Sequence, residues 1–265
     1  MTKTHTPRKR FGQNFLIDKN IIAAIIAAID PIAEQHILEV GPGGGVLTDA
    51  LVTSKAKIDA VEIDRDLARA LQKRFSAANF TLHCMDVLKF PIAELKIDSK
   101  SKKLRVVGNL PYNISTPLLF KLFNHINLID DMFFMLQHEV ALRLAAKPNS
   151  KDYGRMSVMA QYYCDMEIIL NVPPSAFEPA PKVNSSIVHF TPHLKPIVDV
   201  IDHDLLHTIV TQAFSQRRKT IANSLNPLIS NTDLSALQID PQLRAENLTL
   251  YNYAQIANYI TNQGK

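Results

Sequence analysis

The sequence has few of the features that mark secreted, membrane-spanning or metal-binding proteins. Its two cysteines, Cys84 and Cys164, form no CxxC pair and sit in apolar surroundings, so we expect two free, buried thiols in a reducing, cytoplasmic setting. No apolar run approaches the roughly 20 residues that span a bilayer. The basic N-terminus lacks the continuous apolar stretch of a secretory signal. The nine histidines are scattered and form no HExxH motif, so we expect no metal site.

Acidic residues are absent before Asp18, and positive charge is unevenly spread. The formal net charge is +4 and the isoelectric point about 9.0. Positive residues gather in three places: residues 3–10, which include Arg8, Lys9 and Arg10; residues 96–105; and Arg217, Arg218 and Lys219. Any one cluster is more often plain surface charge. Three separate clusters on an otherwise balanced chain favour a polyanionic partner.

Strands and helices are expected to alternate along the first part of the chain. Short apolar runs predict strands at 36–40, 57–63, 80–84, 104–108 and 132–136. Helices are predicted at 21–29 (capped by Asp18), 46–53, 66–75 and from residue 138. Segments 168–172 and 186–190 are expected to pair antiparallel at the sheet edge. This order predicts an α/β fold, a parallel sheet with helices on both faces.

A second, smaller domain is expected after a linker at 192–196. Helical patterns at 204–225, 233–237 and 251–260 follow, with no strand signal among them. We therefore predict a domain at 1–194 and a small α-helical C-terminal domain at 195–265.

Candidate ligand-binding residues stand at the ends of four predicted strands, where ligands of doubly wound sheets bind. Gly41 and Gly43 belong to a glycine turn, 41–45, that lets the backbone approach a ligand closely. Glu62 follows Gly41 by 62 − 41 = 21 residues, the usual place for a carboxylate that accepts ribose hydroxyls. Asp86 is a candidate acceptor for an adenine amino group, and Asn109 ends the fourth strand.

The glycine turn distinguishes between nucleotide ligands. The dinucleotide pattern GxGxxG would place its last glycine at position 46, which is Val46, so a nicotinamide dehydrogenase is disfavoured. No GKS or GKT follows, which excludes a P-loop. Glu39, just before the turn, suits a cationic methionine moiety rather than a pyrophosphate. Together with Glu62, Asp86 and Asn109, the turn predicts S-adenosylmethionine as the cofactor.

The tetrapeptide Asn109-Leu110-Pro111-Tyr112 has an unusually narrow chemistry. The Asn109 amide oxygen and the Leu110 carbonyl can accept both N–H bonds of an exocyclic amine, while the ring of Tyr112 stacks on the base. Variants of this motif mark the amino-methyltransferases that act on adenine or cytosine. Phe177 lies in a proline-rich loop, which favours a rigid, exposed stacking partner over the alternative of a core aromatic.

Three further motifs carry a whole-length family resemblance, from about residue 8 to about 260. They are the segments 11–16 (FGQNFL), 177–185 (FEPAPKVNS) and 214–220 (FSQRRKT). With Asn109 to Tyr112, they resemble the ribosomal RNA adenine N6,N6-dimethyltransferases, in particular the bacterial type acting on 16S rRNA. The resemblance implies a Rossmann-like S-adenosylmethionine-dependent methyltransferase domain with a small α-helical C-terminal domain.

The resemblance also implies site residues and a substrate. The implied cofactor contacts are Asn14, Leu16, Gly41, Glu62, Asp86 and Asn109. The implied reaction dimethylates N6 of two adjacent adenosines in the 3′-terminal hairpin of small-subunit rRNA. The basic residues at 8–10 and 217–219 are then expected to contact RNA phosphates, with only one or two of the latter three engaged. The partner is ribosomal RNA or the immature small subunit, and the protein is expected to be a monomer.

Two alternatives stay open. The relatives that methylate large-subunit rRNA and confer macrolide resistance share most of these motifs, although segment 11–16 and Leu110 favour the small-subunit branch. A non-catalytic rRNA-binding assembly factor is the second alternative, and the intact Asn109 motif and glycine turn count against it.

Overall fold

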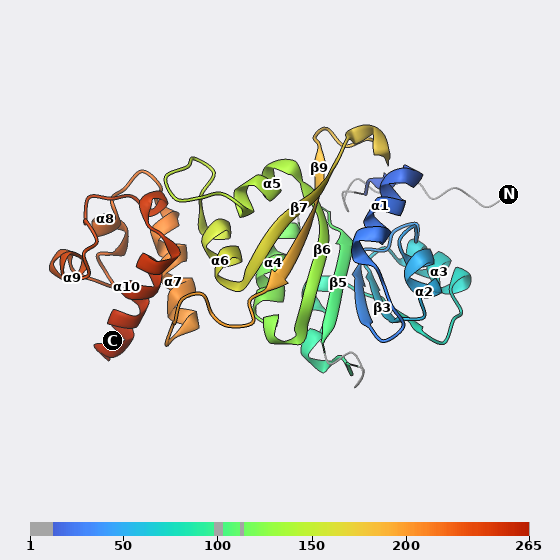
Figure 1. Cartoon of the computed structure of the whole chain (residues 1–265), viewed down its shortest axis with the longest axis horizontal. Coiled ribbons are helices and arrows are strands. Elements are labelled where there is room, and N and C mark those ends of the chain that lie inside the picture. The colour runs from blue at the N-terminus through green and yellow to red at the C-terminus, as the bar shows by residue number, and fades with distance from the viewer. Residues whose placement is uncertain (1–12, 98–102, 112–113, 265) are drawn as a thin grey trace. The chain divides into compact units, whose positions relative to one another are not determined.

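The computed structural model describes residues 13–97, 103–111 and 114–264 (Figure 1). The chain divides into two compact units. The first comprises Met1–Ala141 and Met166–Pro192, and the second comprises Leu142–Asp165 and His193–Lys265. The predicted division at 194/195 lies close to the third and last point where the chain passes from one unit to the other, between Pro192 and His193. Residues 142–165, however, group with the second unit, although the prediction placed them in the first domain.

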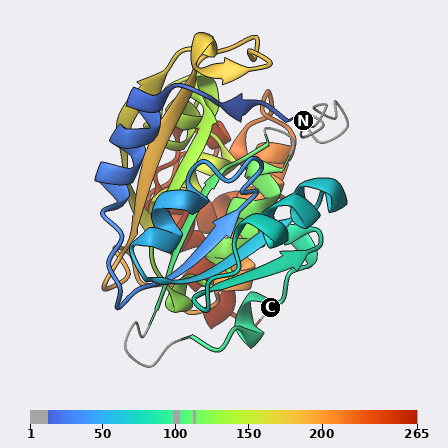
Figure 2. The ribbon, with the colours of Figure 1, turned by 90° about the vertical axis from the view of Figure 1, so that its right-hand side faces the viewer.

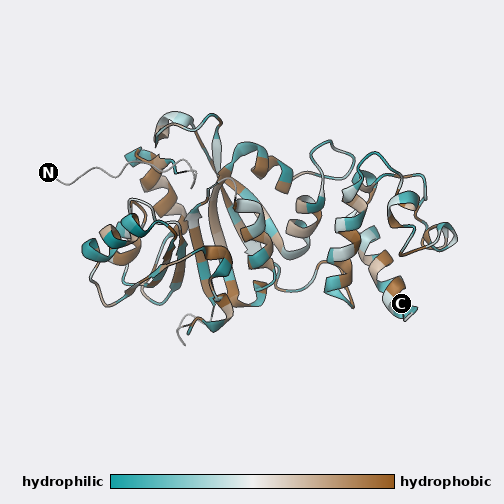
Figure 3. Cartoon of the chain, turned by 180° about the vertical axis from the view of Figure 1, so that it is seen from behind, coloured by the Kyte–Doolittle hydropathy of each residue, from teal (hydrophilic) through white to brown (hydrophobic). Residues whose placement is uncertain are grey.

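A seven-stranded sheet forms the centre of the described part of the first unit. Its strands run in the order β4 (Phe80–Cys84), β3 (Lys57–Glu62), β2 (His36–Val40), β5 (Leu104–Asn109), β6 (Ile129–Gln137), β9 (Ser185–Pro192) and β7 (Cys164–Val172). The pairs from β4 to β6 are parallel, and β9 runs antiparallel to β6. All five residues of β2 are buried, as expected for a strand covered on both faces. The strands are largely apolar in Figure 3.

Helices cover both faces of this sheet, which confirms the predicted α/β class. The helices are α1 (Lys19–Ile29), α2 (Thr48–Thr53), α3 (Arg65–Arg74) and α4 (Ser115–Phe123). From β2 the chain steps one way to β3 and β4, whereas β5 and β6 step the other way. Right-handed crossovers therefore place α2 and α3 on one face and α4 on the other. Helix α1, in blue in Figure 2, lies along one side of the sheet.

The first helix is fixed at both ends. At its start the Asp18 carboxylate accepts hydrogen bonds from the Asn20 and Ile21 amides at 2.8 and 3.2 Å, the N-cap that the sequence predicted. At its end Asp30 adopts a left-handed conformation with φ 45°. Its buried Ile25 and Ile29 pack into a core with Ile37, Ile58 and Val107 of the sheet.

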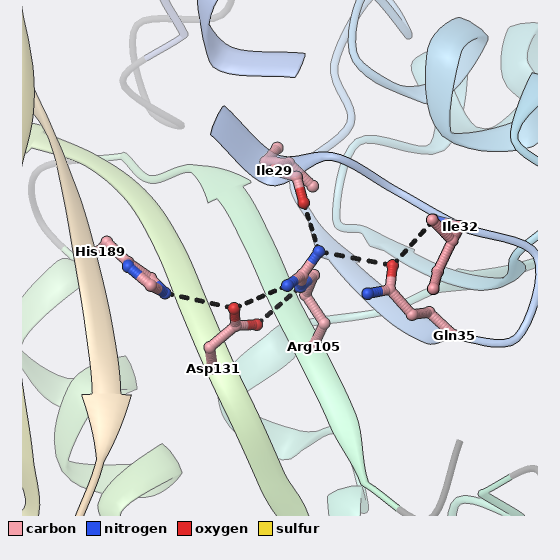
Figure 4. A network of polar contacts seen from close by, with 6 residues as sticks. All are labelled: Ile29, Ile32, Gln35, Arg105, Asp131 and His189. Atoms are coloured by element: carbon pink, nitrogen blue, oxygen red, sulfur yellow. Dashed lines mark hydrogen bonds and ion pairs between the residues drawn. The ribbon is translucent and has the colours of Figure 1, made fainter. Parts of the chain in front are cut away.

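A polar network joins the end of α1 to the sheet (Figure 4). Arg105 on β5 forms a bidentate ion pair with Asp131 on β6, with N–O distances of 2.7 and 2.8 Å. Its guanidinium also donates to the Ile29 carbonyl, which would otherwise be one of the unpaired carbonyls of the helix terminus. His189 on β9 contacts Asp131 at 3.2 Å. Arg105, part of the second basic cluster, is therefore committed to the fold rather than to an outside partner.

The second unit is helical in its described part. Its elements are α5 (His138–Leu144, which begins in the first unit), α6 (Arg155–Tyr163), α7 (His203–Ser215), α8 (Ile221–Leu225), α9 (Asn231–Ala236) and α10 (Leu250–Asn262). One side of α7 is buried through Leu206, Ile209 and Val210. The hydroxyls of Tyr162 and Tyr163 on α6 pair with His203 and His207 on α7 at 2.6 and 2.9 Å.

The structure differs from several sequence-based expectations. The predicted helix 204–225 is two helices, because a turn at 216–219 separates α7 from α8. Helices α4 and α6 were not predicted. Cys84 is exposed because β4 is an edge strand, and only Cys164 is buried. The histidines are also less scattered than expected, because His189 and His193, and His203 and His207, each form an HxxxH pair.

Membrane-spanning helices and metal sites were sought among the described residues. No helix among them is both long and apolar enough to cross a bilayer. No group of three or more histidine, cysteine or acidic side chains within them has the arrangement of a metal site.

Candidate active site

A cavity of about 370 Å³ opens at the carboxyl ends of the parallel strands of the first unit. This is the edge where doubly wound sheets bind ligands. Its walls come from residues 13–16, the end of β2 with the glycine turn, the end of β3, Leu67 of α3, the turn after β4, residues 109–111 and Ile114, with Phe177 beside them. Every described residue predicted to bind the cofactor lines this cavity: Asn14, Leu16, Gly41, Gly43, Glu62, Asp86 and Asn109.

The glycine turn requires glycine at position 43. Gly43 has φ +56°, in the left-handed region, and a Cβ there would lie 3.3 Å from the ring of Phe15. Its amide donates to the Glu62 carboxylate at 3.1 Å. The turn is therefore packed against both the segment at 13–16 and the end of β3, with its backbone facing the cavity.

Two carboxylates in the cavity wall are buried. Burial raises the pKa of Glu39 to about 7; a hydrogen bond from Thr48 at 2.8 Å lowers the pKa, and neighbouring Glu62 and Asp49 raise it. Burial also raises the pKa of Glu62, whose oxygens accept backbone N–H bonds from Gly43 and Asp64. Two backbone donors thus hold the Glu62 carboxylate in one orientation at the cavity wall.

The charge of the cavity selects a cation. Among its described lining residues, Glu39, Glu62 and Asp86 are acidic, and none is lysine, arginine or histidine. A dinucleotide pyrophosphate would find no positively charged partner in such a wall. A sulfonium or an ammonium group would find negatively charged ones. The residues present therefore fit S-adenosylmethionine, which carries both.

Asp86 begins a tight turn after β4. Its Oδ1 accepts the Leu88 amide at 2.9 Å and caps the one-turn helix η2 (Val87–Lys89). From the sequence, both a ligand role and a turn-forming role are possible for Asp86. The turn-forming contact is present, and Asp86 lies in the cavity wall with Met85 and Val87.

Asn109 is oriented by a contact on its donor side. Its Nδ2 donates to the Asn14 carbonyl at 3.2 Å. A carbonyl accepts only, so this contact determines the orientation of the amide and leaves Oδ1 as the acceptor. The neighbouring Leu110 amide donates to the Met135 carbonyl at 3.3 Å. No described residue donates to Asn109 Oδ1 or to the Leu110 carbonyl, and both residues line the cavity.

Phe177 is buried, whereas its proline-rich loop predicted an exposed side chain. Only 4% of it is exposed, and it belongs to the hydrophobic core cluster. The reason is strand β8 (Phe177–Glu178), which pairs antiparallel with β1 (Phe15–Leu16) and draws Phe177 inward. Phe177 nevertheless lines the cavity, so the expected exposure is wrong while the expected location at the site holds.

The remaining predicted site residues differ in their outcome. Tyr112, Arg8, Lys9 and Arg10 are outside the described residues, and Pro111 lines the cavity. Arg217, Arg218 and Lys219 lie in the exposed turn after α7. Arg217 donates to the carbonyls of Lys151 and Tyr153, so it partly serves to hold a loop of its own unit.

Sequence reasoning missed some contacts that build the site. Thr48, at the start of α2, binds Glu39. Gln13 donates to Asp64 at 3.2 Å and thereby joins the first described segment to the end of β3. No motif marks these residues, and only the capping position of Asp64 before an acidic first turn gives a local signal.

Comparisons with known proteins agree with the geometry. The model of the family "Ribosomal RNA adenine dimethylase" matches residues 4–262. A protein of Histophilus somni named ribosomal RNA small subunit methyltransferase A is 50% identical over 261 residues, 97% of this chain and 93% of its own. Its counterpart in Pseudomonas aeruginosa is 50% identical over 257 residues, 97% of this chain and 95% of its own.

Solved structures show the same fold. A dimethyladenosine transferase from Plasmodium falciparum matches with a TM-score of 0.79 and 26% identity, over 94% of this chain and 98% of its own. The 23S rRNA methyltransferase ErmE matches with a TM-score of 0.68 and 22% identity, over 94% of this chain and all (100%) of its own. The chain therefore belongs to the ribosomal RNA adenine dimethylase family, and S-adenosylmethionine is its cofactor.

Proposed function

We propose that this enzyme dimethylates N6 of two adjacent adenosines in the 3′-terminal hairpin of small-subunit 16S rRNA. It acts as a monomer in the cytoplasm, on the small subunit during its biogenesis. Relatives named for the small subunit are 50% identical to this chain, whereas the 23S rRNA enzyme is 22% identical. This contrast supports the small-subunit substrate over the large-subunit alternative.

The observation that carries the proposed chemistry is the orientation of Asn109. Its amide nitrogen donates to the Asn14 carbonyl, which leaves Oδ1 as the acceptor, and both Asn109 and Leu110 line the cavity. Asn109 Oδ1 and the Leu110 carbonyl match the two N–H groups of an adenine amine. Accepting both bonds draws the nitrogen toward tetrahedral geometry and frees its lone pair from the ring.

The bound cofactor supplies an electrophilic methyl group, and the protein supplies position. Orientation of two reactants alone lowers a barrier by roughly 7–11 kcal/mol. No general base is needed before transfer, because the methylated ammonium is acidic and loses its proton readily. Phe177, with Tyr112, is proposed to stack on the flipped adenine, a contribution of about 1–3 kcal/mol per base.

The second methylation places a specific demand on this site. A monomethylated amine offers one N–H to two acceptors, so either Asn109 Oδ1 or the Leu110 carbonyl then faces a methyl group. The wall beside them includes the apolar residues Ile114 and Phe177, which can accommodate that methyl group. We propose the same pocket for both rounds.

Label transfer tests the substrate. The purified enzyme is incubated with radiolabelled S-adenosylmethionine and, separately, with under-methylated small subunits and with large-subunit rRNA. The proposal expects label in small-subunit RNA alone. Label in large-subunit RNA would favour the macrolide-resistance branch, and tight subunit binding without label would favour a non-catalytic assembly factor.

A further inference from the structure

Helix α4 contains a single charged residue, Lys121, in the otherwise uncharged segment Ser115–Phe123. Leu118, Leu119 and Leu122 on either side of it are buried. A lysine in such a helix ordinarily extends its ammonium into solvent. Lys121 instead turns toward the backbone of the segment after β4.

The Lys121 ammonium is held by three carbonyls. Its Nζ lies 3.1 Å from the Val87 carbonyl, 2.8 Å from that of Leu88 and 2.5 Å from that of Phe90. An ammonium has three N–H donors, and here each has an acceptor. Burial lowers the pKa of Lys121, and the charge of nearby Asp86 opposes that shift.

These carbonyls belong to the turn that carries Asp86. Asp86 caps the start of η2 through the Leu88 amide, and Lys121 binds the carbonyls at its end. The Val87 carbonyl also accepts the Phe90 amide at 3.1 Å, and the Phe90 carbonyl accepts the Ile92 amide at 3.0 Å, so the ammonium adds a side-chain contact to a turn already closed by backbone hydrogen bonds. Met85, Asp86 and Val87 on this turn form one wall of the cavity, and Ile114, which precedes α4, forms another.

We infer that Lys121 is a positioning residue that holds the Asp86 turn in the conformation that recognises the adenine amino group of the cofactor. This inference rests on the proposed function and on the sequence-based prediction that Asp86 accepts from that amino group. Lys121 touches neither cofactor nor substrate. It acts through the backbone of residues 87–90 and joins that turn to the helix that follows the Asn109 motif.

The test is a ratio of two affinities on one protein preparation. S-adenosylhomocysteine carries the amino group, and S-inosylhomocysteine carries a carbonyl oxygen in its place. Isothermal titration calorimetry measures both dissociation constants for the wild type, Lys121→Met and Asp86→Asn. Because the ratio is taken within one preparation, it does not depend on the fraction of protein that is folded.

The wild type is expected to prefer S-adenosylhomocysteine by roughly 10- to 100-fold, the range for one hydrogen bond to a charged group. Lys121→Met is expected to reduce that preference to within about threefold of the Asp86→Asn value. Lys89→Met is the matched control, since Lys89 is an exposed lysine on the same turn, and it is expected to keep the wild-type preference.

A merely structural role for Lys121 would weaken both ligands equally and leave the ratio unchanged, which would overturn the inference. If Lys121→Met does not fold, the ratio of the two dissociation constants is measured for Lys121→Gln instead, which keeps an N–H donor. A wild type without any preference would overturn both the Asp86 contact and this inference. Loss of label transfer with a normal wild-type ratio would instead fault the proposed reaction alone.

Discussion

The side-chain amide of Asn109, at the end of β5, donates a hydrogen bond to the backbone carbonyl of Asn14, 95 residues earlier in the chain, at 3.2 Å. This contact has two consequences. It leaves Oδ1 as the acceptor of the amide, and it joins the motif that we propose to bind the adenine to the residue that precedes β1. Alternation along β5 places Arg105, Val107 and Asn109 on one face of the sheet. On that face, Arg105 at one end of β5 binds the end of α1, and Asn109 at the other end carries the proposed acceptor.

Replacing Asn109 tests the acceptor directly. Asn109→Ala is expected to lower kcat by roughly 10²- to 10³-fold, the cost typical of removing one preorganised hydrogen-bonding group from a transition state. Asn109→Asp keeps an acceptor but loses the donor to Asn14, so it is expected to retain more activity than the alanine variant and to bind cofactor more weakly. Steady-state kinetics and calorimetry separate the two effects. An alanine variant with wild-type kcat would sink the acceptor role.

Glycine at position 108 is required by the sheet. A Cβ there would lie 2.5 Å from the Val40 carbonyl of the neighbouring strand, a backbone atom that cannot move without disrupting the β2–β5 pairing. Gly108→Ala is therefore expected to destabilise the protein by roughly 1–3 kcal/mol or more. Denaturant unfolding measures the change. Gly44→Ala, whose Cβ would meet no atom within 4 Å, is the control and is expected to be nearly neutral.

Cofactor binding is expected to release protons near neutral pH. The pKa of Glu39 is raised to about 7, chiefly by burial, so much of it is protonated below that pH. A cationic ligand favours the ionised carboxylate, and affinity should therefore rise as pH increases through about 7. Calorimetry at pH 6.5 in two buffers of different ionisation enthalpy detects the released protons. Glu39→Gln should abolish that difference, and an unchanged difference would contradict the assignment.

The same carboxylate affects stability without ligand. Its folded pKa lies above its unfolded value, so the folded state holds the proton more tightly, and the associated stability is present at acidic pH and lost as pH rises through about 7. Glu39→Gln is expected to be more stable than the wild type above that pH and to show a smaller difference below it. Thermal unfolding at pH 5.5 and pH 8 measures this trend, and a difference of the opposite sign would refute it.

Removing one partner of the Arg105–Asp131 ion pair is expected to lower the stability more than removing both partners. Both side chains are largely buried, so Arg105→Met leaves a buried carboxylate with only His189 beside it and is expected to cost about 3–5 kcal/mol. The double variant Arg105→Met/Asp131→Leu removes both charges and is expected to recover a large part of that loss. Urea unfolding measures the free energy of unfolding of both variants. A double variant less stable than the single one would contradict this prediction.

The turn at 216–219 provides a test of RNA binding. Arg217 also holds a loop, so the cleaner variant is Arg218→Ala/Lys219→Ala, two exposed residues of the same turn. RNA affinity should fall, and the slope of log affinity against log salt should decrease by about 1 for each lost phosphate contact. The exposed pair Arg65→Ala/Lys73→Ala on α3 is the charge-matched control. Equal slopes in the wild type and the Arg218/Lys219 variant would mean that these residues are surface charge only.

Strongly periodic segments and motifs could be predicted from the sequence, and contacts between distant residues could not. The strands around Val40 and Val107 are continuous apolar runs, and Asp18 is a standard helix cap, so their elements were predicted within a few residues. Helix α4 was missed because it is apolar almost throughout and directly follows the Asn109 motif. The burial of Phe177 depends on its pairing with Leu16, some 160 residues away, which no local pattern reveals. The contacts of Lys121 with backbone carbonyls likewise leave no pattern in the sequence.

The central claim is tested most directly by counting modified nucleosides. Small subunits that lack the modification are incubated with enzyme and S-adenosylmethionine, and their RNA is then digested and quantified by mass spectrometry. We predict two N6,N6-dimethyladenosines per small-subunit RNA with the wild type and, over the same reaction time, only a small fraction of that yield with Asn109→Ala. Methylation at another atom, or of large-subunit RNA instead, would contradict this prediction.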